Sequence, residues 1–194
     1  MAKHAEHEKR RAAFAAAAFD ILAREGLQGL TVRNVARTAG YTTGALVHYF
    51  PAKNDLFLAA SEHAAEIVRP RMDEEEISFP GLEGLRQVIY EALPRTPKAR
   101  ALWSVWLVFW DHARIDPDVG KLARERYTEW LNRLTRLFRK AIEAGDIAAH
   151  HNPERLARTA TVLVDGIAIQ ALRSSMRLTA AQQTAMIDDW LAAL

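Results

Sequence analysis

Residues 31–53 read TVRNVARTAGYTTGALVHYFPAK and carry the strongest structural signal in the chain. The apolar spacing predicts two short helices, over residues 31–38 and 43–50, with Thr31 and Thr42 at their starts as candidate N-cap residues. Gly40 lies in the short connection between them, and Pro51 ends the second helix. The stretch therefore predicts a helix-turn-helix.

A helix is predicted over residues 8–25, and we expect it to pack against the apolar side of the two short helices. Phe14, Ala18 and Leu22 fall on one stripe, and Gly26 follows as a stop. Three helices of this kind form a DNA-binding unit whose last helix enters a major groove about 12 Å wide. We expect Leu46 and Phe50 to lie in its core and the opposite side of the last helix to read DNA.

That opposite side carries small or polar side chains, as close approach to base edges requires. Its members are Thr43, Gly44, Val47 and His48. Thr31 and Thr42 stand at helix starts, where they cap and can also touch phosphates. Arg33 projects from the first short helix toward a guanine edge or the backbone, and Lys53 begins the next helix on the same side.

Three segments in this region resemble the signature of the TetR family of transcription regulators. They are residues 26–36 (GLQGLTVRNVA), 39–46 (AGYTTGAL) and 48–53 (HYFPAK), followed by Leu56. The resemblance implies contacts to bases from Arg33, Thr43, Gly44 and His48, and contacts to phosphates from Thr31, Thr42, Tyr49 and Lys53. Many members have a tyrosine where this chain has Val47. An apolar contact to a thymine methyl is a substitute for the usual hydroxyl contact, so the operator sequence does not transfer from a relative.

The rest of the chain also predicts helices, because proline and glycine fall between periodic runs and no alternating strand pattern occurs. The expected ranges are 53–71, 82–94, 98–115, 117–144, 153–175 and 180–193. With the three N-terminal helices this gives an all-α protein of about nine helices. We expect a helix-turn-helix domain over residues 1–52 and an effector-binding and dimerisation domain over residues 53–194.

The helix over residues 98–115 holds three of the five tryptophans. Trp103, Trp106 and Trp110 share one broad face, which is typical of core packing and also of the wall of a small-molecule pocket. A pocket would be lined by these three together with Asp111 and Tyr127, and an aromatic cage with a carboxylate suits a cation. The C-terminal half resembles, more loosely, the effector domain of the BetI-type branch of the family.

Residues 161–172 are apolar nearly all round the helix, which predicts burial on two sides. With the last helix they form half of a four-helix bundle, so we expect a homodimer through residues 153–193. Gly166 permits close approach of helices. Asp165 is costly to bury alone and should find a hydroxyl, an arginine or a ligand as its partner.

Charge and composition exclude several classes of protein. The chain has no cysteine, which removes disulfides and thiolate metal sites. Residues 1–53 carry a net charge of +4 and the remainder −2, so one end suits a polyanion. Lys9, Arg10 and Arg11 suit contacts to phosphates or a minor groove, but we expect them in a charged, disordered end. Without a signal-peptide core or an apolar run of about 20 residues, the chain is expected in the cytoplasm and not at a membrane.

The sequence thus predicts a ligand-responsive transcriptional regulator, a repressor released from a palindromic operator by a small molecule. It predicts no enzyme, catalytic residue, metal site or cofactor, because no acid–base pair or metal-ligand spacing is present. The alternative is a ligand-binding or scaffold protein of the same fold that has lost or altered its DNA recognition, a possibility that Val47 leaves open.

Overall fold

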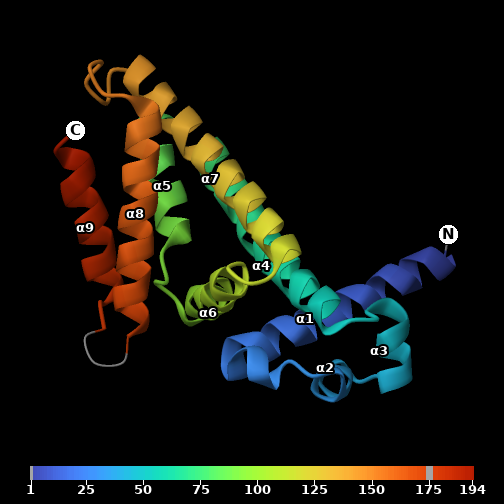
Figure 1. The fold of residues 1–194 in the computed structure, drawn as a ribbon. Helices are drawn as coiled ribbons and strands as arrows, with labels where there is room; N and C mark the ends of the chain where they lie inside the picture. Colours follow the sequence, from blue (N-terminus) through green and yellow to red (C-terminus); the bar gives the residue numbers. More distant parts are fainter. Residues whose placement is uncertain (1, 174–176) are drawn as a thin grey trace. The chain divides into compact units, whose positions relative to one another are not determined.

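The computed structural model describes residues 2–173 and 177–194, and in these residues it contains nine helices and no strand (Figure 1). The expected all-α fold is confirmed. The helices are α1 (Ala2–Gly29), α2 (Val32–Ala39), α3 (Thr43–Tyr49), α4 (Lys53–Ser78), α5 (Gly81–Ala92), α6 (Pro97–His112), α7 (Pro117–Glu143), α8 (Pro153–Leu172) and α9 (Ala180–Ala192). None of the helices in these two ranges combines the length and the apolar character that a membrane span needs.

The chain forms two compact units. The first comprises residues 1–67 and 101–120, and the second comprises residues 68–100 and 121–194. The first unit therefore holds α1 to α3 together with the beginning of α4 and most of α6, and α4 continues into the second unit. The division of the chain into domains 1–52 and 53–194 stays a prediction.

The N-terminal end differs from expectation. Lys9, Arg10 and Arg11 were assigned to a disordered end, but they lie in α1, which begins at Ala2. The reason is local, because apart from His4 and His7 these turns consist of alanine, glutamate, lysine and arginine, which are strong helix formers. The expected stop at Gly26 is visible as a kink, with φ 65° and ψ −165° inside the assigned helix.

The predicted ends of three later helices also change. Helix α4 passes Pro70 and continues to Ser78, beyond the expected end at residue 71. Helix α6 ends at His112 and residues 113–115 form a turn. Helix α8 ends at Leu172, and of the predicted extension to residue 175, residues 174 and 175 lie outside the described residues.

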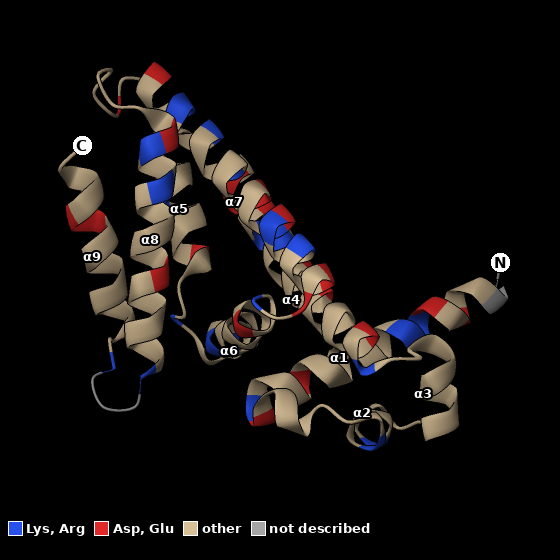
Figure 2. Ribbon diagram, in the orientation of Figure 1, with Lys and Arg blue, Asp and Glu red and all other residues tan. Residues whose placement is uncertain are grey.

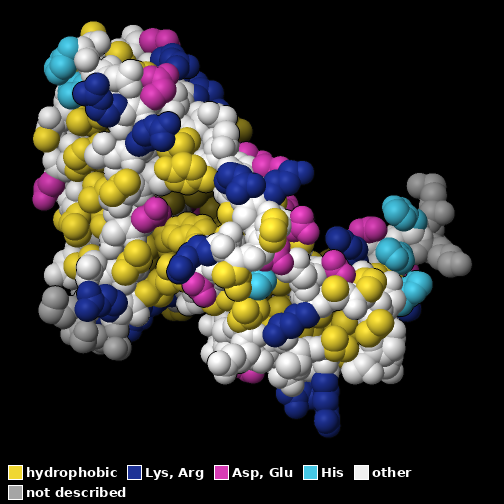
Figure 3. Space-filling view, in the orientation of Figure 1, with side chains coloured by type: hydrophobic (Ala, Val, Ile, Leu, Met, Phe, Trp, Pro, Cys, Tyr) yellow, Lys and Arg dark blue, Asp and Glu magenta, His cyan; other side chains and the backbone are white. Residues whose placement is uncertain are grey.

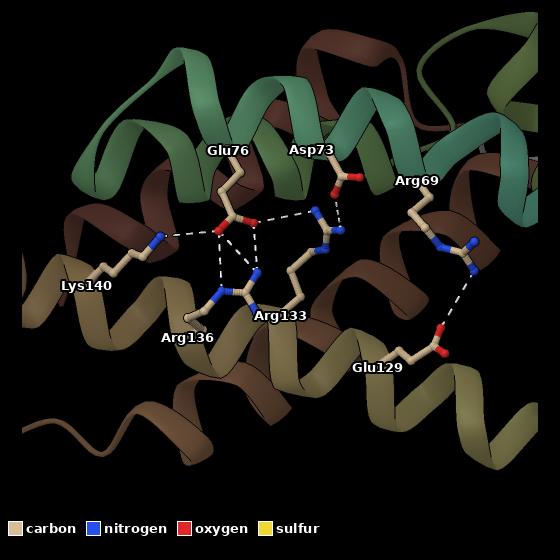
Figure 4. A network of polar contacts seen from close by, with 7 residues as sticks. All are labelled: Arg69, Asp73, Glu76, Glu129, Arg133, Arg136 and Lys140. Carbon is tan, nitrogen blue, oxygen red and sulfur yellow. Dashed lines mark hydrogen bonds and ion pairs between the residues drawn. The ribbon is translucent and has the colours of Figure 1, made fainter.

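In the second unit, ion pairs join the end of α4 to α7, along which basic residues recur (Figure 2). Glu76 of α4 is the centre of this network and its side chain is only 15% exposed. Arg136 donates to it at 2.9 Å, Lys140 at 3.3 Å, and Arg133 lies 3.6 Å away while also pairing with Asp73 (Figure 4).

The surroundings of Glu76 hold its carboxyl in the charged form. Burial by itself raises the pKa of Glu76, but the hydrogen bonds and charges of Arg136 and then Lys140 outweigh it, so the pKa lies below its usual value. A carboxyl with a lowered pKa in the folded state stabilises that state when it is ionised. The network therefore fixes the last turns of α4 against α7.

We predict that Glu76→Gln lowers the free energy of unfolding by about 1–2 kcal/mol at pH 7, because it leaves three cations without their shared anion. Glu74→Gln, which removes an exposed carboxylate from the same helix, should change little. The contribution is fully present above the unfolded pKa of roughly 4.3. It is lost as the pH falls through the lower folded value, so the difference between wild type and Glu76→Gln should shrink below about pH 4. Urea unfolding at equal protein concentrations measures both effects, and equal losses for the two variants at pH 7 would contradict this role of Glu76.

Candidate nucleic-acid interface

Helix α2 begins and ends as the sequence predicts. The Thr31 hydroxyl accepts a hydrogen bond from the Asn34 backbone N–H at 3.2 Å, which caps the helix. At the other end Gly40 has φ 77°, a left-handed conformation that favours glycine. The Tyr41 N–H then donates to the Ala36 carbonyl at 2.9 Å, so the turn into the next helix is closed by backbone bonds.

Helix α3 is placed by a cap and two buried side chains. The Thr42 hydroxyl accepts from the Ala45 N–H at 3.2 Å. Leu46 and Phe50 are buried, as expected, and they hold one side of this seven-residue helix against the rest of the unit. The other side is thereby turned outward.

The outward side consists of the residues expected to read bases. Thr43, Gly44, Val47 and His48 are all exposed, and a Cβ added at Gly44 would meet no atom within 4 Å. Val47 exposes 45% of its surface although it is apolar. A short helix with this profile offers a smooth surface that fits a groove.

Residues of α2 and α4 flank this surface within the same unit. Arg33 is exposed on α2, whose basic residues are visible in Figure 2. Lys53 begins α4 and its Nζ donates to the Leu27 carbonyl at 3.1 Å. That bond holds the ammonium group close to the kink at Gly26, and the lysine remains exposed.

Tyr49 is half-buried among three rings. Its ring centroid lies 4.5 Å from His7, 5.5 Å from Phe14 and 5.7 Å from His48. The contact from His7 was missed at the sequence level. A signal for it exists, because His7, Arg10 and Phe14 follow the spacing of one helix face.

Two of the five residues expected to line a pocket contact each other within the first unit. The rings of Trp103 and Trp110 meet edge to face at 5.6 Å, whereas Trp106 contacts Phe109. Asp111 pairs with Arg114 at 3.5 Å in the same unit. Tyr127 belongs to the other compact unit and is 45% exposed, so a shared pocket stays a prediction.

Helix α8 of the second unit exposes an apolar face. Val162 is 70% exposed and Ile169 45%, with the exposed Gly166 between them. Met186 of α9 is 42% exposed, and apolar side chains are visible over both helices in Figure 3.

Burial raises the pKa of Asp165 to about 6, so near neutral pH its carboxyl is only partly protonated.

Comparison with known proteins agrees with this organisation. The family described as "Bacterial regulatory proteins, tetR family" matches residues 15–60, and that described as "BetI-type transcriptional repressor, C-terminal" matches residues 81–194. The HTH-type transcriptional regulator PksA of Bacillus subtilis (strain 168) is 27% identical over 182 residues, which are 92% of this chain and 86% of PksA.

Two further relatives extend the comparison. The HTH-type transcriptional regulator BetI of Escherichia coli O157:H7 is 24% identical over 156 residues, covering 79% of this chain and 77% of BetI. The crystal structure of a transcriptional regulator from Saccharomonospora viridis in complex with choline superimposes with a TM-score of 0.88. It is 23% identical and covers 96% of each chain.

The capped helix pair and its outward surface define a helix-turn-helix protein. More particularly, the chain belongs to the TetR family of transcriptional regulators, with a C-terminal part of the BetI type. Regulators of this family bind operator DNA and act as dimers, and in general they are not enzymes.

Proposed function

We propose that the protein is a repressor that binds a palindromic operator as a homodimer and releases it when a small molecule binds. The observation that carries the DNA-binding part is the surface of α3, where four exposed small or polar residues stand opposite the buried Leu46. We assign contacts to bases to Arg33, Thr43, Gly44, Val47 and His48. Contacts to phosphates are assigned to Thr31, Thr42, Tyr49 and Lys53.

We predict that selection from random duplex DNA yields inverted repeats. Two α3 helices of a dimer read half-sites one helical turn, about 34–36 Å, or a multiple of it apart. Affinity for the selected operator should fall steeply with salt while a preference over random DNA remains. Binding without sequence preference would instead favour the alternative, a family member with lost DNA recognition.

Two variants refine this prediction on the selected operator. Lys53→Glu should weaken binding to all sequences at least about tenfold, whereas His48→Ala should relax the choice of base at one position of each half-site. Lys98→Glu, which changes an exposed lysine of the second unit, serves as the matched control. Equal affinities of Lys53→Glu and Lys98→Glu would remove Lys53 from the interface.

The exposed face of α8 supports dimerisation through residues 153–193. Val162, Gly166 and Ile169 follow i, i+4 and i+7 spacing, so they form one continuous stripe along the helix. Exposed apolar stripes of this kind mark protein interfaces, and in a twofold dimer the same stripe contacts itself. Gly166 lets two such helices approach closely.

We predict that Gly166→Leu gives a folded monomer. Gly166 is exposed and an added Cβ meets no atom within 4 Å in the single chain, so we expect the larger side chain to obstruct a partner. Sedimentation velocity measures the mass in solution, and far-UV circular dichroism measures the helix content. Ile115→Leu, a change at an exposed position of the first unit, should remain dimeric. A dimeric Gly166→Leu would place the interface elsewhere.

Helix α6 supports the ligand-responsive part of the proposal. Trp103 and Trp110 present two rings edge to face, and tryptophan faces attract quaternary ammonium groups. The choline complex of the Saccharomonospora viridis regulator agrees with a cationic small molecule. A ligand releases DNA only if it binds more tightly to the conformation with low DNA affinity.

We predict that choline, used as the probe, changes the tryptophan fluorescence and lowers operator affinity in the same concentration range. The neutral isostere 3,3-dimethylbutan-1-ol should act only at much higher concentrations, because it lacks the charge. Trp110→Leu should weaken the response to choline at least about tenfold if the ring holds the cation. Equal potency of choline and its neutral isostere would contradict a cationic effector.

A further inference from the structure

The first turns of α1 precede the part of the chain that matches the tetR-family model. That match begins at residue 15, whereas α1 begins at Ala2. Residues 4–14, here called the N-terminal turns, therefore lie outside the part matched by that model. They form a regular helix and their exposed side chains include both histidine and arginine.

The N-terminal turns pack onto residues at both ends of α3. The ring of His7 packs, tilted by 36°, against that of Tyr49 at the C-terminal end of α3, with ring centroids 4.5 Å apart. The guanidinium of Arg10 lies over the ring of Tyr41, just before α3, at 5.9 Å. Phe14 contacts both tyrosines, at 5.1 and 5.5 Å.

These contacts fix two cations beside the surface assigned to DNA. Arg10 is held over Tyr41, and the exposed Arg11 lies over the Phe50 ring at 5.4 Å. Figure 3 shows that histidine side chains gather close to the N-terminal end of α1. A cation placed in advance loses less conformational entropy when it binds a phosphate.

The N-terminal turns also carry carboxylates, which repel a DNA phosphate. Glu6 accepts a hydrogen bond from Arg10 Nε at 2.9 Å, and Glu8 lies 3.6 Å from the His7 ring. The bond to Glu6 uses one of the five N–H donors of the guanidinium, and the other four are on its two terminal nitrogens. A phosphate is therefore attracted by Arg10 and repelled by Glu6.

We propose that the N-terminal turns are a second DNA-contacting surface, in which Arg10 and Arg11 bind backbone phosphates next to those assigned to Tyr49 and Thr42. The proposal rests on the proposed DNA-binding function and extends it. Its occupant is duplex DNA, because the turns are anchored on residues that flank α3. Phosphate contacts add affinity that does not depend on base sequence.

The test compares variants of the full-length protein on the selected operator and on a random duplex. The double variant Arg10→Gln with Arg11→Gln should reduce the slope of log affinity against log salt by about 2, and affinity at 0.1 M salt about tenfold. Arg10→Lys with Arg11→Lys retains the charges and should keep most of the slope. Arg24→Gln with Lys98→Gln removes two exposed charges elsewhere and should leave the slope unchanged.

Glu6→Gln should change DNA affinity in the opposite direction. It removes the repelling carboxylate and releases Arg10, so it should tighten DNA binding several-fold. Replacing single operator phosphates by neutral methylphosphonates identifies the phosphates that are contacted. At the positions bound by Arg10 and Arg11, the replacement should lower the affinity of the wild type but not that of the double glutamine variant. An unchanged slope in the double glutamine variant, or weaker binding by Glu6→Gln, would overturn the inference. If the wild type bound DNA without sequence preference, only the proposed operator recognition would fail. The slope of log affinity against log salt on random DNA would still test the N-terminal turns.

Discussion

The packing of Phe14 is the contact on which the DNA-facing surface depends. Its side chain is fully buried in α1 and touches the rings of Tyr41, Tyr49 and Phe50. These residues stand immediately before and at the end of α3, so one aromatic side chain fixes both ends of a helix too short to be stable alone. The caps determine where the short helices begin, and Phe14 determines where they lie.

The second unit uses charge where the first uses aromatic packing. Glu76 is mostly buried, and its burial is favourable only because three cations of α7 surround it. An apolar side chain at this position would pack equally well against many neighbours. An anion requires the matching cations, so the network selects one register of α4 against α7.

Local features of the fold were predictable from the sequence, whereas contacts between distant segments were not. Thr31, Thr42 and Gly40 act through hydrogen bonds to residues three to four positions away, which a linear pattern contains. The ring contact of His7 with Tyr49 joins residues 42 positions apart, and the bond from Arg136 to Glu76 joins residues 60 apart. Such contacts depend on how helices pack, which periodicity does not specify. The same limit applies to the tryptophans of α6, whose spacing fits a core and a pocket equally well.

Pro70 has a consequence for the mechanics of α4. The residue lies inside this helix, three positions after Ile67, where the first of the two segments of the first unit ends. Proline has no backbone N–H, so the carbonyl four residues earlier receives no helical hydrogen bond from it. Bending α4 at this point breaks one bond fewer than bending it elsewhere. Helix α4, which passes from the first unit into the second, therefore has its most compliant segment close to the crossing.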